Sequence, residues 1–290
     1  MPGAATVRAT PLYEIRSAMG GADPFASVPA APAIPGPVSL MRPERIASNG
    51  MDLLIADSGL QAVLRTDRAA SVMSVVVRLP ATRAGGLAVD RLGSIFVSVP
   101  AEGTVWQIDR TGRIDRRLQD AAVLASPESV VVDDQGRIFV ADALGARVAI
   151  FDRTGRVTTV VGPRNGVPDA FRAVSGMALG PAGLHVLDAA ARRIVVVDPR
   201  GSVIREAGLD PSVKAPAGIA ADRWGRIFVG DRAVGGVWAI SATSDAATSV
   251  EGVSVSAELA DLAVDESGTL YVADAAGGVV RTFRLTQPCP

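Results

Sequence analysis

The feature that most constrains the fold is a unit of about forty residues that recurs six times along the chain. Its clearest copy, residues 126–157, contains three runs rich in β-branched and aromatic residues, at 129–132, 137–141 and 147–151. Each run has the length of a strand. The Asp-Asp-Gln-Gly sequence after the first run and the Arg-Thr-Gly sequence after the third are typical of tight turns. Three strands cannot bury both faces of their sheet alone, so each unit must pack against its neighbours.

The six copies share one spacing, with the third strand expected to close ten positions after the second strand ends. The copies cover residues 45–66, 85–108, 126–157, 175–197, 217–240 and 261–283. Repeats of this length built only of strands are typical of β-propeller blades. We therefore predict an all-β fold, a six-bladed β-propeller with four-stranded antiparallel blades.

The last copy supplies only three strands before the sequence ends. The alternating segment 6–15 can supply a fourth, and we expect a strand near residues 12–16 to complete the last blade. Hydrogen bonds between the two ends of the chain would then close the ring and remove an exposed sheet edge. This divides the chain into an N-terminal closing strand with a Pro/Ala-rich linker, residues 1–41, and the propeller, residues 42–290. The alternative is that residues 1–41 form a disordered leader.

Three stretches resemble the NHL repeat: Pro-Ala-Gly-Ile-Ala-Ala-Asp at 216–222, Gly-Thr-Leu-Tyr-Val-Ala-Asp at 268–274 and Arg-Val-Ala-Ile-Phe-Asp at 147–152. The resemblance covers about residues 42–285 and implies a six-bladed propeller, related to those of the SMP-30 and gluconolactonase type. Such propellers include enzymes, RNA binders and protein-binding scaffolds. The resemblance is therefore more specific for the fold than for the function.

Composition restricts the classes of function and of location. A formal net charge of −1, from 29 basic and 30 acidic residues, gives no overall field for binding a polyanion. No apolar stretch approaches the roughly 18 residues of a membrane-spanning helix, and no signal peptide is visible. The Pro/Ala/Gly-rich stretch 18–43 is typical of tethers in exported proteins. It favours an extracytoplasmic location, in the periplasm or cell envelope, with lipid anchoring through a removed N-terminal segment as one route; a cytoplasmic location is the alternative.

Ligands of propellers are expected around the central channel, where one rim is formed by two rings of residues. The first ring precedes the innermost strands and comprises Arg45, Gly86, Ser129, Gly176, Gly218 and Asp261, with Glu44 and Glu128 beside it. The second ring ends the second strands and comprises Asp57, Val99, Asp142, Asp188, Asp231 and Asp274. Its five carboxylates are expected to face one mouth of the channel and to make it negative.

Two interpretations of the five carboxylates stay open. They could bind a basic ligand or a structural calcium ion, which prefers carboxylate and carbonyl oxygens. Alternatively, each Asp accepts backbone N–H bonds from the turn that follows it. The recurrence of one residue type favours the structural interpretation, because a catalytic group is normally singular.

Residues that occur once in their ring are better candidates for a site. Arg45 and Asp261 are of this kind, and Glu128 lies beside them. These residues could form an ion pair across the channel, contact a partner or remain solvated. Trp224, in the turn between a first and a second strand, is expected to be partly exposed and is a candidate interface anchor. The candidate binding residues are therefore Glu44, Arg45, Glu128, Asp142, Asp188, Asp231, Asp261, Asp274 and Trp224, with no residue assigned as catalytic or metal-ligating.

Motifs for metal-assisted catalysis are missing from the sequence. By the resemblance, a gluconolactonase-type site needs a Glu from a Glu-Gly-Pro segment, two Asn and an Asp, but the chain has no Glu-Gly-Pro and only Asn49 and Asn165. The only histidine, His185, aligns with packed aromatic residues of other copies, and Cys289 is the only cysteine. No cofactor is expected.

The sequence therefore favours a non-enzymatic scaffold that binds another protein, as a component of an envelope, secretion or surface assembly, with no nucleic acid and no membrane span. A metal-dependent hydrolase or lactonase of the gluconolactonase type is the first alternative. An RNA-binding NHL propeller is the second, which the expected acidic rim disfavours because RNA binders use basic grooves with stacking aromatics.

Overall fold

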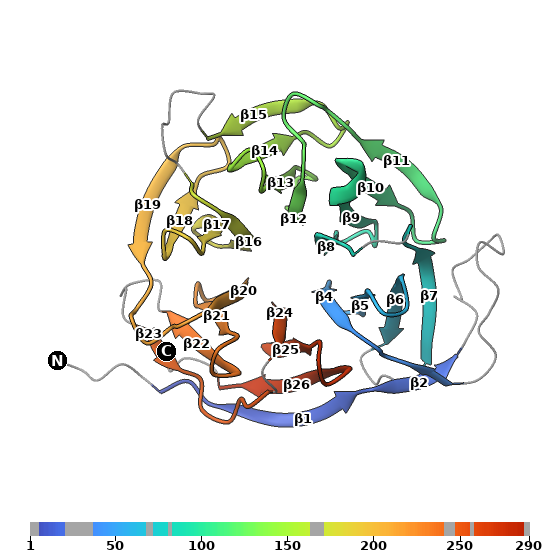
Figure 1. Ribbon diagram of the computed structural model, residues 1–290, viewed down its shortest axis with the longest axis vertical. Coiled ribbons are helices and arrows are strands. Elements are labelled where there is room, and N and C mark those ends of the chain that lie inside the picture. Colours follow the sequence, from blue (N-terminus) through green and yellow to red (C-terminus); the bar gives the residue numbers. More distant parts are fainter. Residues whose placement is uncertain are drawn as a thin grey trace.

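Six small sheets surround a central axis like the blades of a propeller (Figure 1), which confirms the predicted fold. The computed structural model describes residues 6–20, 37–67, 72–80, 83–162, 171–240, 247–255 and 258–286. In each blade the first strand lies innermost and the next strands follow outward. Among these residues no helix is long and apolar enough to cross a membrane.

The strands fall close to the predicted ranges. Blades 1 to 3 comprise, from the innermost strand outward, β4 (Pro43–Ser48), β5 (Asp52–Asp57), β6 (Ala62–Asp67) and β7 (Val72–Arg78); β8 (Gly86–Val89), β9 (Ile95–Val99), β10 (Thr104–Ile108) and β11 (Ile114–Leu118); and β12 (Pro127–Val132), β13 (Ile138–Asp142), β14 (Arg147–Phe151) and β15 (Val157–Val161). Blades 4 to 6 comprise β16 (Val174–Gly180), β17 (Gly183–Asp188), β18 (Arg193–Val197) and β19 (Val203–Gly208); β20 (Pro216–Ala221), β21 (Ile227–Asp231), β22 (Gly236–Ile240) and β23 (Ala247–Ser249); and β24 (Leu259–Val264), β25 (Thr269–Asp274), β26 (Val279–Leu285) and β1 (Ala9–Ile15).

The core lies between neighbouring blades. The middle strands β13 and β14 are buried at every position, whereas the outer strand β15 is buried only at its last residue. One apolar cluster joins Phe139 of blade 3 to Val186 and Val195 of blade 4. Because burying one such side chain contributes about 1.5–3 kcal/mol, stability comes from packing each blade against the next.

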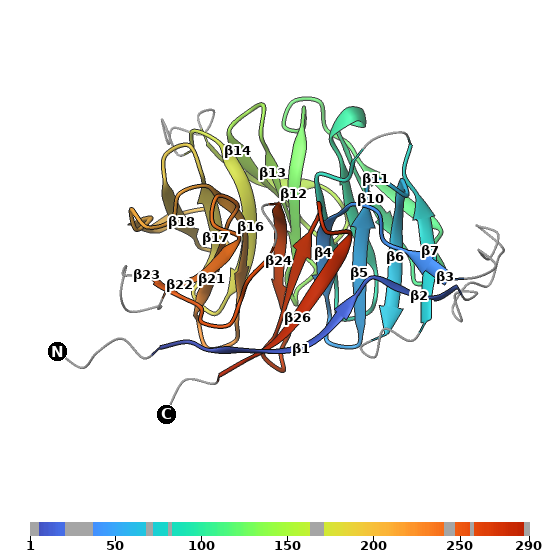
Figure 2. The same ribbon diagram turned by 60° about the horizontal axis from the view of Figure 1, so that its bottom comes forward.

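The N-terminal segment closes the ring, as predicted. Strand β1 pairs antiparallel with β26, with Ala9 opposite Leu285 and Ile15 opposite Val280. The segment also reaches further than predicted, because Glu251 of blade 5 exchanges backbone hydrogen bonds with it, and β2 (Ser17–Gly20) pairs parallel with β7 of blade 1. Figure 2 shows β1 and β2 passing along the outside of these blades.

Both ends of the Pro/Ala-rich stretch therefore belong to strands. Strand β3 (Pro37–Ser39) pairs antiparallel with β2, so the sheet of blade 1 has six strands. The middle of the stretch, residues 21–36, lies outside the described residues.

The two ends of the propeller are formed by different connections. We call the loop face the end formed by the residues before each innermost strand and by the turns between second and third strands. The turn face is the opposite end, formed by the turns between first and second strands and between third and fourth strands. In the turn after β12, for example, Asp133 Oδ1 accepts the N–H groups of Gln135 and Arg137, both at 2.9 Å. This local bonding explains why Asp precedes a glycine-containing turn.

Candidate functional site

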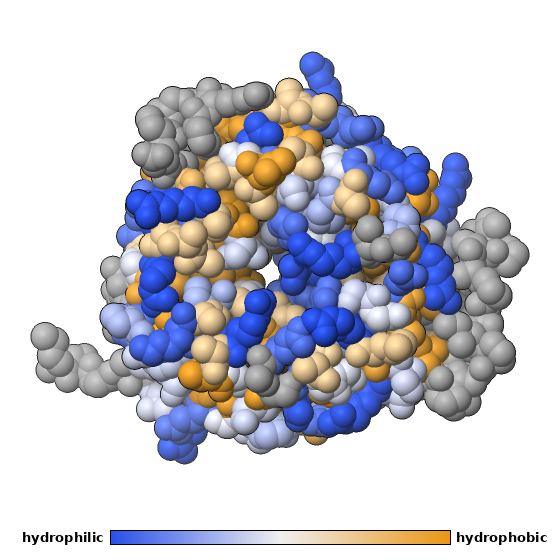
Figure 3. All heavy atoms as spheres, in the orientation of Figure 1, coloured by the Kyte–Doolittle hydropathy of each residue, from blue (hydrophilic) through white to orange (hydrophobic). Residues whose placement is uncertain are grey.

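A channel runs along the axis between the six innermost strands, with a volume of about 210 Å³. It opens at the centre of the loop face, which Figure 3 shows from above. Two of the first-ring glycines are required by close approach of neighbouring strands. A Cβ atom at Gly86 would lie 2.7 Å from Ser129 Cα, and one at Gly218, whose φ is +72°, would lie 3.0 Å from Asp261 Cα.

The second-ring carboxylates do not line the mouth of the channel. All five are fully buried, so the expectation that they face one mouth is wrong. The cause is hydrogen bonding that spacing along the strands does not reveal. In blade 3, Asp142 accepts N–H bonds from Ala125 and Ser126 before the innermost strand, and from Gly145 in the turn after the second strand. Arg147 pairs with the same carboxylate at 3.0 Å.

The same arrangement recurs around the ring. Asp57 accepts the N–H groups of Met41, Arg42 and Leu60, at 2.8–3.0 Å. Asp188 and Asp231 likewise each accept three, and Asp274 accepts that of Gly277 at 2.9 Å. Four of the five, Asp57, Asp142, Asp188 and Asp231, therefore join the loop before their blade to the turn at the same end, and Asp274 holds that turn in blade 6.

A calcium ion shared by the second ring does not fit this arrangement. The carboxylate oxygens already accept N–H hydrogen bonds, and the five residues belong to five separate blades. Within the described ranges no three His, Cys, Asp or Glu side chains converge as ligands of a metal ion.

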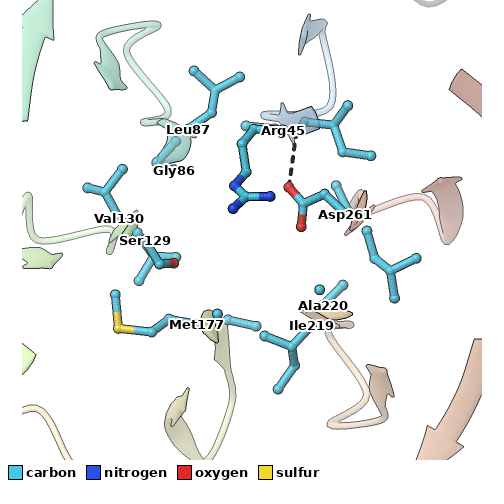
Figure 4. Close-up of a pocket in the computed structure, with 18 of the residues that line it drawn as sticks. Arg45, Gly86, Leu87, Ser129, Val130, Met177, Ile219, Ala220 and Asp261 are labelled. Carbon is cyan, nitrogen blue, oxygen red and sulfur yellow. Dashed lines mark hydrogen bonds between the residues drawn. The ribbon is translucent and has the colours of Figure 1, made fainter. Parts of the chain in front are cut away.

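Arg45 stands on β4, where the register between β4 and β5 shifts by one residue. Such a bulge redirects side chains, and here the guanidinium points into the channel (Figure 4). Its Nε donates to the carbonyl of Gly85 in the next blade, and its Nη1 donates to the carbonyl of Glu44 at 2.9 Å. These two bonds hold the guanidinium against one side of the wall.

Asp261 faces the same part of the channel from β24, which carries a similar register shift. Its Oδ2 accepts the N–H of Ile46 at 3.1 Å, but its carboxylate forms no ion pair with Arg45. Burial in the channel wall raises the pKa of Asp261 to about 6, and the positive charge of Arg45 offsets only part of that rise. Asp261 is thus a carboxyl group that changes charge near neutral pH.

Charged pairs occupy the rim above this point. Glu44 pairs with Arg42 at 3.0 Å, and Arg42 also pairs with Glu258 of blade 6. Glu128 pairs with Arg83 at 2.8 Å. Hydrophilic residues accordingly gather beside the opening over β4 and β8, whereas more hydrophobic residues lie over β12 and β14 (Figure 3).

The structure therefore separates the candidate residues into groups. Glu44, Arg45, Glu128 and Asp261 lie together at or just below the loop-face opening. The second-ring Asp residues lie at the same end but inside the wall. Trp224 lies on the turn face, half-buried, with its ring 3.6 Å from the Cβ position of Gly268 and with Arg223 stacked on it.

Sequence reasoning missed the pair formed by Arg42 and Glu258. A signal for it exists, because the two residues occupy equivalent positions, directly before the innermost strands of blades 1 and 6. Opposite charges at equivalent positions of adjacent blades thus indicate that the two side chains lie near each other. Arg45 and Asp261 show the same pattern one level deeper in the channel.

The remaining polar candidates lie elsewhere. His185 packs between blades against Gly180, where burial lowers its pKa and so favours the neutral ring. Asn49 caps its own turn on the turn face by accepting the N–H groups of Met51 and Asp52. Asn165 and Cys289 lie outside the described residues.

No family model and no curated protein matches the chain. Several solved structures share its fold. A gluconolactonase from Xanthomonas campestris is 14% identical, with 96% of this chain and 97% of that chain covered and a TM-score of 0.66. A streptogramin B lyase is 12% identical over 97% of each chain, with a TM-score of 0.65. A chain of a nidogen/laminin complex is 16% identical, over 74% of this chain and 84% of that chain, with a TM-score of 0.61.

These identities establish a shared fold and no more. A lyase, a gluconolactonase and a chain of a nidogen/laminin complex are all similar to this chain in architecture. The resemblance to the NHL repeat stays a sequence-based prediction.

Proposed function

We propose that the protein is a non-enzymatic scaffold that binds another protein on its loop face, as a component of an envelope, secretion or surface assembly. The observation that supports this best is the use of the second-ring carboxylates, which are buried and hold the loops by backbone hydrogen bonds. The polar groups that recur around the ring therefore stabilise a surface and offer no reactive oxygen. A surface with preorganised loops loses little conformational entropy when it binds.

The loop face carries the side chains that such an interface needs. Met41, Leu144 and Val234 are large apolar residues there, exposed by 61%, 78% and 59%. Charged pairs such as Arg83 and Glu128 lie on the same face. Apolar anchors within a polar rim are typical of protein interfaces.

The test is site-specific photo-crosslinking in the cells that produce the protein. A photoreactive residue at position 144 should crosslink to one defined protein, whereas one at Leu92, an equally exposed apolar position on the turn face, should not. With that partner purified, Leu144→Asp and Val234→Asp should each raise the dissociation constant at least tenfold, and Leu92→Asp should leave it unchanged. Equal crosslinking at both faces, or an unchanged dissociation constant in both Leu144→Asp and Val234→Asp, would contradict the proposal. Fractionation should place the complex in the cell envelope.

A metal-dependent hydrolase or lactonase is the second candidate, and one observation favours it. Asp261 changes charge near pH 6 inside the channel, and general acid-base catalysis needs a carboxyl of this kind. A panel of lactones, assayed with and without calcium or zinc, tests this candidate. Turnover that Asp261→Asn abolishes would replace the scaffold proposal.

RNA binding gains no support from the loop face. Its rim arginines Arg42 and Arg83 are paired with Glu258 and Glu128, so they do not form a continuous basic groove. A salt-sensitive gel shift with single-stranded RNA would overturn this conclusion.

A further inference from the structure

We propose that the channel binds a small zwitterion with an apolar side chain, such as an α-amino acid of the size of leucine. Arg45 would bind its carboxylate and Asp261 its ammonium group. The inference goes beyond the scaffold function, because it assigns a ligand to the channel whatever protein the loop face binds.

The cationic half of the site is fixed and yet available. Two bonds to backbone carbonyls, those of Gly85 and Glu44, hold Nε and Nη1 of Arg45. Its Nη2 has no hydrogen-bond partner among the residues that the structure describes. The guanidinium therefore presents donors toward the open space shown in Figure 4, and guanidinium donors suit the planar geometry of a carboxylate.

The anionic half lies beside it but remains separate. Asp261 faces the same space, held by the N–H of Ile46, and no ion pair joins it to Arg45. One level above, Arg42 and Glu258 do pair directly. Arg45 and Asp261 stay apart because Arg45 donates to the carbonyl of Gly85 in blade 2, whereas Asp261 accepts the N–H of Ile46 in blade 1.

A molecule that carries both charges matches this arrangement better than a molecule with one. A ligand with only a carboxylate would pair with Arg45 but would be repelled by the negative charge of Asp261. A ligand with only an ammonium group would pair with Asp261 but would be repelled by the positive charge of Arg45. A zwitterion avoids both repulsions, since like charges in a poorly hydrated site are unfavourable.

The rest of the channel sets the size and polarity of the ligand. The other first-ring residues, Gly86, Ser129, Gly176 and Gly218, are small and leave room. Below, the apolar side chains that line the channel include Met177 and Ile219. The volume of about 210 Å³ is smaller than the roughly 300–1,000 Å³ of pockets for drug-sized ligands. An α-amino acid with a branched apolar side chain fits these limits.

Binding should depend on pH through Asp261. The charged group that faces it is Arg45 of β4; the inner strand β20 on its other side presents Gly218, Ile219 and Ala220. At the rim above, Arg42 is paired with Glu258, and Arg83 is paired with Glu128. Because only the ionised carboxylate attracts an ammonium group, affinity should be constant above pH 7 and should fall by up to tenfold per pH unit below about pH 6.

The test is NMR titration of the purified chain at pH 7.5, with the methyl group of Met177 as reporter. L-leucine should shift this signal, whereas N-acetyl-leucine, which lacks the cation, and leucinamide, which lacks the anion, should bind at least tenfold more weakly. Arg45→Gln and Asp261→Asn should each weaken L-leucine binding at least tenfold. Arg83→Gln removes an arginine of the rim and should bind like the wild type.

Three results would overturn the inference. These are the absence of any shift at 10 mM L-leucine, equal binding of the two blocked analogues, and binding that survives Arg45→Gln. Circular dichroism and melting curves establish that each variant is folded. If Asp261→Asn does not fold, the analogue series on the wild-type chain still decides, because it needs no substitution. Failure here leaves the loop-face crosslinking result unaffected, so the two proposals are tested separately.

Discussion

The second-ring carboxylates and the carboxylate of Asp261 lie at the same end of the propeller, and both are set into its wall, yet their surroundings differ. Asp142 accepts three backbone N–H bonds and pairs with Arg147. Asp261 interacts with the N–H groups of Ile46 and Leu262, and Arg45, the arginine that faces it, forms no ion pair with it. Donors from two separate segments and a direct ion pair therefore make the carboxylate of Asp142 structural, whereas that of Asp261, which faces the channel without an ion pair, remains available for a ligand.

The largest effect that this comparison predicts comes from Asp142→Ala. Removal of the carboxylate leaves the N–H groups of Ala125 and Ser126 without their acceptor and leaves Arg147 as an uncompensated buried charge. The free energy of unfolding should fall by about 3–5 kcal/mol in chemical denaturation. Asp134→Ala, at an exposed position of the same blade, should change it by less than about 0.5 kcal/mol. Similar losses of unfolding free energy in Asp142→Ala and Asp134→Ala would show that the carboxylate of Asp142 has no special structural role.

Asp261→Asn should produce a smaller effect that depends on pH. Since the pKa of Asp261 is raised from 3.8 to about 6, the folded state holds this proton more tightly than the unfolded state does. The wild type therefore loses stability as pH rises from 4 to about 7 and changes no further through this group above that. The variant lacks this loss, so its stability relative to the wild type should rise by about 2 kcal/mol between pH 4 and pH 7.5. Urea denaturation at several pH values measures the difference, and a flat profile would contradict it.

Much of the fold was predictable because turn chemistry and strand period are local. The Asp-containing turns and the fixed spacing place the middle strands of every blade to within a residue or two, as in β13 and β14. The pairing of β2 with β7, and that of Arg8 with Glu251, join segments that the repeat does not relate. Such non-local pairing leaves no periodic signal in the sequence.

The site was predictable in position but only partly in character. Spacing identified Arg45 and Asp261 as singular members of the first ring, and the structure brings both to the channel. Spacing could not reveal that Asp142 turns into the wall, because its donors Ala125 and Ser126 precede it by 17 and 16 residues, in a loop without regular structure. Position along a strand is encoded locally, whereas the partner of a side chain depends on tertiary structure.

Arg45→Gln tests whether Arg45 and Asp261 act on each other across the channel. The guanidinium lowers the pKa of Asp261, so its removal should raise that pKa further above about 6. The carboxyl carbon of Asp261, followed by NMR from pH 4 to pH 9, reports this directly. Arg83→Gln serves as the control, because Arg83 pairs with Glu128 on the rim and should leave the titration unchanged. An unshifted midpoint in Arg45→Gln would show that the two groups do not interact.

The smallest effect belongs to a third kind of carboxylate, that of Glu128. It pairs with Arg83 at 2.8 Å, but the arginine side chain is about half exposed to solvent. Ion pairs in such positions contribute little because water and salt screen them, so Glu128→Gln should lower the free energy of unfolding by less than about 0.5 kcal/mol, and by less still in 1 M salt. Urea denaturation at low and high salt measures this. A loss that approaches that of Asp142→Ala would mean that the rim pair also holds the loops in place, and burial together with backbone donors would then no longer separate structural carboxylates from available ones.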